Sequence, residues 1–428
     1  MSRSLFFFEL ALISLLFSLS KSRYFITDGE APIGSDDVFD VTAYGATGDG
    51  ITDDTQVQQN SMLDLVPSVA FRNAWKDTCE SMGSPTMLIP SELTFLLYPV
   101  IFNGKKCNSD HITVLIDGNL IAPSDPSEWE CTPEKCSHWI EFSHVNGLYV
   151  QGSGAIRGQG APWWHLPCNK QHNCSKKPTA FVISRSDNVH LSQLTFEDSP
   201  QMHIAIESSI WIFISYLSII APADSPNTDG IHIQQSQNVY IQQSSIGTGD
   251  DCISIGNGSA YININQILCG PGHGISIGSL GIKKSYETVE FVHVRDVLFF
   301  KTTNGVRIKT WQGGSGFARH MYFERIITQG AALPIVIDQF YCAHSHCQNE
   351  TSAVRISDIT YNKIMGTSEE PMAVKLACSE SVPCTNILMK DVYIASTDDG
   401  RETSSYCLNV QGRQTGKSLP VVPCLMQS

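Results

Sequence analysis

Short segments of alternating apolar residues recur along the chain. Each follows the pattern apolar-x-apolar-x-x-apolar-x-apolar, with small or polar substitutes at some positions, and successive copies begin 23 to 33 residues apart. The copies begin at Val189, Ile212, Val239, Ile262, Val292, Met321, Val354 and Ile387. Alternation over so short a span predicts strands, and no helical pattern of 12 or more residues separates them. One short strand per repeat of this length is typical of a parallel β-helix, a solenoid whose coils stack on one another.

A second repeat lies between the copies of the first. It reads Asp229-Gly230-Ile231-His232-Ile233 and returns at Asp251–Ile255, His273–Ile277 and Asn304–Ile308, in steps of 22, 22 and 31 residues. Its third and fifth residues are apolar and are predicted to point inward, whereas the fourth points outward. Stacked coils lie ~4.8 Å apart, so the first residues should form one column. That column is predicted to contain Met202, Asp229, Asp251, His273, Asn304 and Leu333.

The chain before about Pro178 is less regular. Residues 38–54 are rich in Gly and Asp, and residues 70–81 have the character of a helix. We expect a short helical cap at about residues 38–110, because the open end of a solenoid must be covered. No linker rich in Pro or Ser divides the rest, so residues 23–428 are predicted to form a single domain.

The N-terminus has the layout of a secretory signal peptide. Arg3 precedes an apolar run from Leu5 to Leu19, and small residues follow up to Ser22. We therefore predict a signal peptide at residues 1–22 and secretion to the extracellular space or cell wall. The run is too short to span a membrane comfortably, and no later stretch reaches 18 apolar residues. No membrane association is expected after cleavage.

The chain has 14 cysteines, many of them close together. None of the spacings matches a zinc site, and such local pairs predict disulfide bonds formed in an oxidising compartment. The candidate pairs are Cys79/Cys107, Cys131/Cys136, Cys168/Cys174, Cys252/Cys269, Cys342/Cys347, Cys378/Cys384 and Cys407/Cys424. Glycosylation sequons at Asn173, Asn257 and Asn349 also fit a secreted protein.

The charge of the chain excludes nucleic acid as a partner. Lys and Arg number 28 against 42 Asp and Glu, which gives a formal charge of −14. No basic surface is therefore available to replace the counterions of phosphates.

We expect the mature protein to be a monomer.

Three carboxylates cluster in the middle coils. Asp229 and Asp251 lie one coil apart in the predicted column, and Asp250 directly precedes Asp251. Hydrolysis of a glycosidic bond needs one carboxyl to protonate the leaving oxygen and another to activate water. A separation of roughly 6.5–9.5 Å leaves room for that water and gives inversion. Like charges this close should raise at least one pKa, so that one carboxyl stays protonated.

Basic residues complete the predicted site. His273 lies one coil beyond Asp251, and Arg307 and Lys309 lie two residues apart on the outer face of one strand. Such a cationic pair can hold a carboxylate. Structural interpretations remain open for single residues, because Asp-Gly pairs are frequent in turns and an Asp column can form a ladder or a calcium site.

Five stretches of the chain closely resemble the polygalacturonase family of glycoside hydrolases in its plant-type form. They are Ser225–Gly230, Thr248–Cys252, Cys269–Gly274, Gly305–Lys309 and Ile337–Cys342. The resemblance extends from about Phe39 to Cys424. It implies an all-β fold, a right-handed parallel β-helix, and inverting hydrolysis of α-1,4-linked galacturonan in pectin or polygalacturonate. We expect no cofactor and no metal.

The resemblance also implies roles for the clustered residues. Asp250 resembles the general acid of the family, and Asp229 and Asp251 resemble the pair that activates water. His273 resembles the histidine that supports the acid.

Four further residues resemble parts of the family's substrate site. Arg307, Lys309 and Tyr341 resemble the substrate-binding set, and Asn227 resembles a polar residue close to it. The chain departs from the family at Val57–Val69, where 13 extra residues enter the predicted cap.

Several functions remain open at this point. We favour endo action, with exo action or a rhamnogalacturonan hydrolase as alternatives, although the intact Arg307-Ile308-Lys309 favours galacturonate over rhamnose. A pectate lyase would need calcium and a basic arginine at the scissile bond. A non-catalytic solenoid that binds cell walls is disfavoured because all three carboxylates and His273 are retained.

Overall fold

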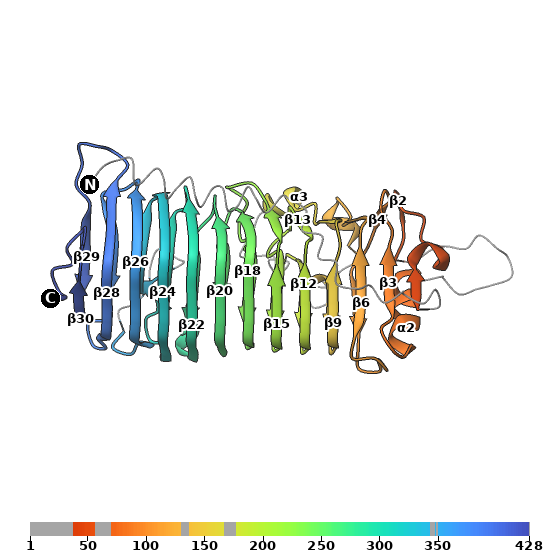
Figure 1. The fold of residues 1–428 in the computed structure, drawn as a ribbon, viewed down its shortest axis with the longest axis horizontal. Helices are drawn as coiled ribbons and strands as arrows, with labels where there is room; N and C mark the ends of the chain where they lie inside the picture. The colour runs from red at the N-terminus through yellow and green to blue at the C-terminus, as the bar shows by residue number, and fades with distance from the viewer. Residues whose placement is uncertain are drawn as a thin grey trace, which may run out of the picture. The chain divides into compact units, whose positions relative to one another are not determined.

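The computed structural model describes residues 37–55, 70–129, 137–166, 177–342, 347 and 350–427. Val38–Ser428 forms one compact unit. Figure 1 shows its strands side by side, in chain order from the orange end to the blue end. Within the described ranges the named strands pair in parallel, in two sheets of 20 and 11 strands. The predicted parallel β-helix is therefore confirmed, and the predicted signal peptide lies outside the described residues.

The smaller sheet has one strand from each coil. Its strands stack in chain order, with registers that the hydrogen-bonded pairs fix residue by residue. They are β5 Val100–Asn103, β8 His138–Ser143, β11 Thr179–Ser184, β14 Ile204–Glu207, β17 Ile231–Gln234, β19 Ile253–Ile255, β21 Ile275–Leu280, β23 Asn304–Trp311, β25 Leu333–Tyr341, β27 Met372–Ala377 and β29 Ser404–Leu408.

The larger sheet forms the other walls of the solenoid. In the first coils it consists of two separate ladders. One ladder ends at β15 (Ile210–Ser215) and the other at β16 (Ser218–Ile220), and both of these strands pair with the long strand β18 (Gln237–Gly247). From β18 onward a single long strand in each coil continues both ladders. The strands are β1 Val38–Asp40, β2 Asp49–Asp53, β3 Thr86–Ile89, β4 Thr94–Leu96, β6 Ile112–Ile116, β7 Asn119–Ile121, β9 Asn146–Gln151, β10 Ala155–Arg157, β12 Asp187–Ser192, β13 Thr195–Glu197, β15 Ile210–Ser215, β16 Ser218–Ile220, β18 Gln237–Gly247, β20 Ser259–Cys269, β22 Tyr286–Phe300, β24 Ser315–Ala331, β26 Arg355–Ser368, β28 Cys384–Ser396, β30 Val410–Thr415 and β31 Met426–Gln427.

Helices are few and short in the part of the chain described. They are α2 Ala70–Glu80, α3 Ala161–Trp164 and the 3₁₀ turns η1 Val41–Tyr44, η2 Pro126–Glu128 and η3 Ile282–Lys284. Helix α2 matches the predicted helix and buries Phe71 and Trp75 against the first coils. The predicted cap region also contains strands β1 to β5, so α2 is the only α-helix that the structure describes there. None of the described helices is long and apolar enough to cross a membrane.

The register confirms the first sequence repeat except for one copy. Ile262 pairs with Val292, Val292 with Met321, and Met321 with Ile359. The copy predicted to begin at Val354 therefore begins five residues later, at Ile359. The cause is a longer coil, since the register partners Met321 and Ile359 are 359 − 321 = 38 residues apart. The first part of β26 already pairs Ile356 with Ala318. Val354 and Ile356 are buried too, so they satisfy the same apolar pattern.

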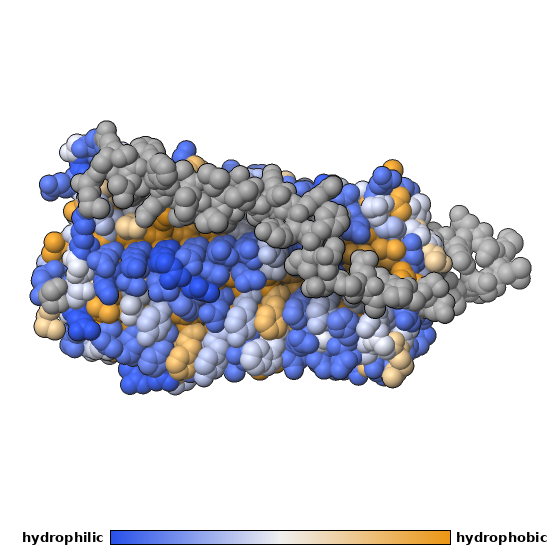
Figure 2. Space-filling model, in the orientation of Figure 1, coloured by the Kyte–Doolittle hydropathy of each residue, from blue (hydrophilic) through white to orange (hydrophobic). Residues whose placement is uncertain are grey.

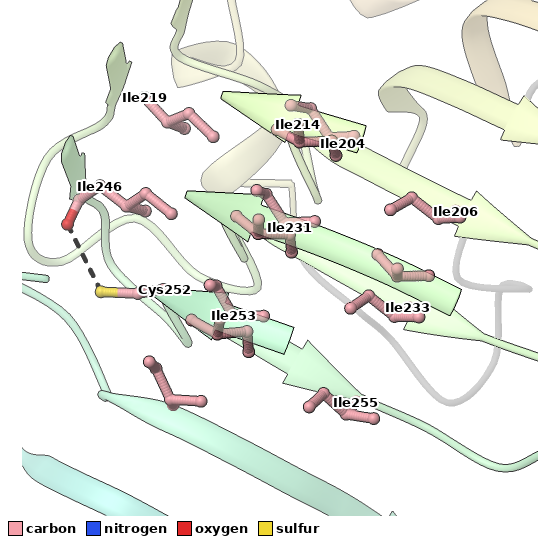
Figure 3. Packing of buried hydrophobic residues seen from close by; sticks show 14 of the residues in the cluster. Ile204, Ile206, Ile214, Ile219, Ile231, Ile233, Ile246, Cys252, Ile253 and Ile255 are labelled. Carbon is pink, nitrogen blue, oxygen red and sulfur yellow. Dashed lines mark hydrogen bonds between the residues drawn. The ribbon is translucent and has the colours of Figure 1, made fainter. Parts of the chain in front are cut away.

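Isoleucines from successive coils stack in the core. Ile231, Ile253 and Ile275 are register partners and are fully buried. Figure 3 shows Ile204, Ile231 and Ile253 one beneath another, with Ile206, Ile233 and Ile255 in a second row. This confirms that the third and fifth residues of the second repeat point inward. Hydrophilic residues cover much of the outer face in Figure 2, and hydrophobic side chains reach it in separate patches.

Five of the seven predicted disulfides are present. They are Cys79–Cys107, Cys252–Cys269, Cys342–Cys347, Cys378–Cys384 and Cys407–Cys424. The other two pairs, Cys131/Cys136 and Cys168/Cys174, lie outside the described residues, as do Asn173, Asn349 and Val57–Val69. Asn257 is described, and its Oδ1 accepts a hydrogen bond from the backbone N–H of Thr288 at 3.0 Å.

Candidate active site

The predicted column of ionisable residues lies at the beginnings of three neighbouring strands. Asp229 precedes β17, Asp251 precedes β19 and His273 precedes β21, and the following isoleucines are direct register partners. Glycines permit this close stacking. A side chain at Gly230 would collide with the carbonyl of Cys252, and one at Gly274 would collide with the carbonyl of Gly305. The turns therefore bring the carboxylates of successive coils together.

Asp229 is a buried carboxyl with a raised pKa. Its side chain is buried, with 8 % of the residue exposed, and its Oδ2 lies 2.6 Å from the donating hydroxyl of Ser254. Burial raises the pKa of Asp229 to about 7, and repulsion by Asp251 and Asp250 adds to the effect. A raised pKa was expected for one carboxyl from like-charge crowding alone; at Asp229 burial is the larger cause, and the repulsion is second.

Asp251 is held by three donors. It accepts hydrogen bonds from Ser276 Oγ at 2.7 Å, from an Arg307 Nη at 2.8 Å and from Lys309 Nζ at 3.0 Å. The residue is 1 % exposed. The cationic pair predicted to hold a carboxylate therefore holds one that belongs to the protein itself. Arg307 also donates from Nε to Ser276 Oγ at 2.9 Å.

Asp250 forms an ion pair with His273. Its Oδ1 lies 3.0 Å from His273 Nδ1 and accepts the backbone N–H of Asp251 at 2.8 Å. Burial works to raise the pKa of Asp250, but the hydrogen bond and charge of His273 outweigh it and leave that pKa lowered. The same hydrogen bond raises the pKa of His273. In the free site the shared proton of this pair is therefore on His273, although the resemblance implies Asp250 as the acid.

The remaining predicted residues border the cluster. The ring of Tyr341 lies 5.5 Å from Lys309 Nζ and packs edge-on against Trp311, with ring centroids 5.3 Å apart. Asn227 lies exposed in a left-handed turn two residues before Asp229, with a φ of 58°. Tyr341 is thus adjacent to the cationic pair, and Asn227 to the strand entry that carries Asp229.

Sequence reasoning missed three polar residues that support the carboxylates, and a histidine that contacts the backbone of Asp229. Ser254 and Ser276 donate to Asp229 and Asp251, and His232 Nδ1 lies 2.8 Å from Ser254 Oγ. These three occupy the outward fourth position of the second repeat, which was the available signal. His203 is fully buried, and its Nδ1 lies 3.2 Å from the carbonyl oxygen of Asp229. Burial lowers the pKa of His203 to about 4, so the imidazole is neutral.

One group of side chains has the composition of a metal site. Ligand atoms of Asp250, Asp251 and His273 all lie within 4.8 Å of one another. Arg307 and Lys309 already occupy both oxygens of Asp251, however, and His273 shares a proton with Asp250. A divalent cation would have to displace these contacts and would be repelled by the two side-chain cations.

Chemically, the arrangement combines proton donors with a fixed carboxylate. Asp229 and the Asp250–His273 pair both hold a proton at acidic pH, whereas two cations hold Asp251. Acid–base catalysis typically uses two titratable groups whose surroundings give them different pKa values.

Comparisons with known proteins agree with this chemistry. The family model described as glycosyl hydrolases family 28 matches residues 79–418. A probable polygalacturonase of Arabidopsis thaliana is 41 % identical over 394 residues, which is 91 % of this chain and 85 % of that protein. The structure of a polygalacturonase from Erwinia carotovora matches with a TM-score of 0.66 and 26 % identity, over 83 % of this chain and 94 % of the other. An endo-xylogalacturonan hydrolase from Aspergillus tubingensis shares the fold, with a TM-score of 0.71 and 23 % identity, over 87 % and 96 % of the two chains.

Proposed function

The chain belongs to the glycosyl hydrolases of family 28, and we propose that it cleaves the α-1,4 bonds between galacturonosyl residues of polygalacturonan and pectin. The cleavage is a hydrolysis with inversion, and it acts on internal bonds of the polysaccharide. The observation that carries the proposal is the cluster of three carboxylates with different protonation beside two cations. The polygalacturonases among its relatives support this substrate.

In the proposed reaction the Asp250–His273 pair is the proton donor. The lowered pKa of Asp250 and the raised pKa of His273 leave the pair with one proton over the whole interval between them. As the glycosidic bond breaks, negative charge develops on the leaving oxygen, and Asp250 delivers the proton to it. His273, 3.0 Å away, supplies that proton to Asp250.

Asp229 and Asp251 activate the attacking water from the other side of the sugar. Asp251 forms ion pairs with Arg307 and Lys309, so it is the member that we assign to accept the proton of water. Asp229 keeps its own proton below a pKa of about 7 and orients the water. Attack by water rather than by a carboxylate gives an inverted anomeric centre. Activity should fall as the pH rises through about 7, because Asp229 then loses its proton. The raised pKa of His273 places the loss of its proton above the ordinary range of histidine.

The cationic pair also recognises the uronate substrate. Arg307 has five N–H donors and Lys309 has three, so both retain donors beyond those that contact Asp251. They can bind a substrate carboxylate while they hold the catalytic one. Tyr341, packed beside Lys309, lies where a sugar next to that carboxylate would contact it.

The test is the product pattern of the purified mature protein on polygalacturonate. We expect reducing ends to appear together with a mixture of oligogalacturonates, because endo action cuts at random positions. Release of monomer alone would show exo action. Rhamnogalacturonan should be cleaved far more slowly, and a chelator should have no effect. An unsaturated product that absorbs ultraviolet light would identify a lyase, and the absence of new reducing ends would refute the hydrolase.

We also propose that the protein is secreted to the cell wall. The apolar N-terminal run and the five described disulfides support an oxidising, extracellular location. Sequencing the N-terminus of protein recovered from the medium of an expressing plant cell culture tests this. A mature chain that begins at about residue 23 is expected, and a full-length chain retained inside the cells would contradict it.

A further inference from the structure

A continuous chain of hydrogen bonds leads away from Asp229 along the outer face of β17 and β19. Asp229 Oδ2 lies 2.6 Å from Ser254 Oγ, and Ser254 Oγ lies 2.8 Å from His232 Nδ1. The other ring nitrogen of His232, Nε2, lies 3.1 Å from Gln234 Oε1. His232 and Ser254 are direct register partners on neighbouring strands, so the backbone fixes their separation.

The direction of these hydrogen bonds depends on the proton of Asp229. When Asp229 is ionised, Ser254 donates its single proton to Oδ2 and must accept from His232 Nδ1. When Asp229 is protonated, it can donate to Ser254, which then donates to His232 Nδ1. In that state Nε2 carries the imidazole proton and donates it to the side-chain amide oxygen Oε1 of Gln234, which lies 3.1 Å away. When Asp229 is ionised, Nε2 becomes an acceptor, and the Gln234 amide must turn so that its NH2 group donates to Nε2. With that turn both states satisfy every member of the chain.

Asp251 has a matching serine but a different second partner. Ser276 donates to Asp251 and accepts from Arg307 Nε. A guanidinium has no acceptor, so this second chain can run in one direction only. It stabilises Asp251 as a carboxylate. In the free site, the contrast between His232 and Arg307 therefore distinguishes the two aspartates, because only the chain of Asp229 can adapt when a change of pH removes or restores a proton.

We propose that His232, acting through Ser254 and backed by Gln234, is a positioning residue that holds Asp229 in place in both of its protonation states. The inference rests on the proposed hydrolysis for its catalytic meaning. What we propose physically is that the hydrogen bonds from Asp229 to His232 reverse their donor–acceptor direction when Asp229 gains or loses its proton. Without His232, the hydroxyl of Ser254 can donate only to Asp229, and that hydrogen bond is stronger when Asp229 is ionised, so Ser254 would favour ionised Asp229.

Several charged groups face this chain and could also move its titration. Around His232 they are Glu207 at the end of β14, Asp251, and Lys309 on β23. Around Asp229 they are Asp251, Asp250 and Lys309. Burial lowers the pKa of His232, so the imidazole is neutral in the range where Asp229 titrates. The proton change in that range therefore belongs to Asp229, and the test must change the chain without changing these charges.

The experiment compares His232→Leu with Ser254→Ala. His232→Leu leaves Ser254 able only to donate, so the pKa of Asp229 should fall and the alkaline limb of the pH–rate profile should move to lower pH. Ser254→Ala removes the hydrogen bond that stabilises ionised Asp229, so its pKa should rise and the limb should move to higher pH. Each variant should lose about tenfold in kcat, as for one lost hydrogen bond, with KM nearly unchanged. His232→Gln, whose amide can donate or accept, should recover part of the loss.

A matched control and a substrate-free measurement complete the test. His190→Gln changes a histidine that stacks between Tyr149 and Phe213 on the larger sheet, and its profile should match the wild type. The ¹³C signal of the Asp229 carboxyl, identified by its loss in Asp229→Asn, should titrate lower in His232→Leu and higher in Ser254→Ala. Shifts in the same direction, or no shift, would overturn the inference. If the wild type did not hydrolyse polygalacturonate, the proposed function would fail, and the ¹³C titration alone would decide the inference.

Discussion

At the residue scale, Asp229 and Asp251 occupy the same position of the repeat, but their carboxyls differ in protonation because the groups around them differ. Each accepts a hydrogen bond from a serine one coil further on. Asp251 also contacts Arg307 and Lys309, whereas burial and two negative neighbours raise the pKa of Asp229. The division between a proton-holding and an ionised carboxyl therefore comes from the order of residues in the next two coils.

Asp250→Asn should remove nearly all activity and leave the fold unchanged. The amide can still contact His273 but cannot deliver a proton to the leaving oxygen, which should lower kcat by about 10²–10⁴-fold or more. The measurement is kcat on polygalacturonate, with circular dichroism to verify folding. Asp187→Asn, an exposed aspartate at the start of β12, is the control and should retain wild-type activity. A variant that kept more than about a tenth of kcat would refute the role of Asp250.

The raised pKa values predict that the protein loses stability as the pH rises. Asp229 and His273 both bind protons more tightly in the folded state, so their contribution is fully present below their unfolded pKa values. It is lost as the pH rises through the folded values, about 7 for Asp229. Urea unfolding should give a lower free energy of unfolding at pH 8 than at pH 6.5. The lower limit lies at the ordinary histidine pKa of 6.5, because His203 and His232, whose pKa values are lowered, destabilise the fold increasingly below it. Asp229→Asn should reduce this difference, and an equal difference in both proteins would contradict the account.

Arg307→Ala and Lys309→Ala should affect both catalysis and binding. Each side chain contacts Asp251, so its loss should lower kcat on any substrate. Each is also proposed to bind a substrate carboxylate, so KM should rise on polygalacturonate and less on fully methyl-esterified pectin, which lacks the anion. Steady-state kinetics on the two substrates separate these effects. Equal increases of KM on both substrates would exclude contact with the substrate carboxylate.

At the element scale, alternation and repeat length were sufficient to predict the coils and most of their register. The inward positions of the second repeat agree with the paired residues Ile231, Ile253 and Ile275. The copy at Val354 was placed wrongly because an extended coil repeats the same apolar pattern before the in-register segment begins. The column of Asp229, Asp251 and His273 was also predictable, since it follows from the register alone.

Other parts of the site could not be predicted from the pattern. An outward serine on a strand is usually solvated, and the burial of Ser254 and Ser276 becomes apparent only when the neighbouring coils are in place. The contact of Arg307 and Lys309 with Asp251 could not be predicted either. Their position on an outer face suggested a free clamp, but the contact with Asp251 depends on the path of two long side chains.

Ile253→Ala tests the stacking of the core beneath the site. Ile253 is fully buried between Ile231 and Ile275, so truncation leaves a cavity that rigid coils cannot close. We expect a loss of about 2–5 kcal/mol in the free energy of unfolding, measured with urea. Ile220→Ala is the control, because Ile220 is 52 % exposed, and it should change stability by less than about 0.5 kcal/mol. Similar losses in both variants would contradict the stacked-core account.

At the scale of the whole molecule, the net charge is a poor guide to the ligand. The chain has a formal charge of −14, although the proposed substrate is itself a polyanion. Salt screens exposed charges beyond about 8–10 Å, so distant carboxylates contribute little at the site. The local balance is different there, because Asp229 keeps its proton at acidic pH and Arg307, Lys309 and His273 carry positive charge. Binding should therefore be favoured at acidic pH.

The central claim is hydrolysis of polygalacturonate by a water held among three carboxylates, and the anomer of the first product tests it most directly. Proton NMR of the reaction, recorded before mutarotation is complete, should show the new reducing end as the β-anomer. Asp250→Asn should give almost no such signal under the same conditions. This result follows because water attacks directly and no covalent intermediate forms. An initial α-anomer would mean that one of the carboxylates acts as a nucleophile, and would contradict the account.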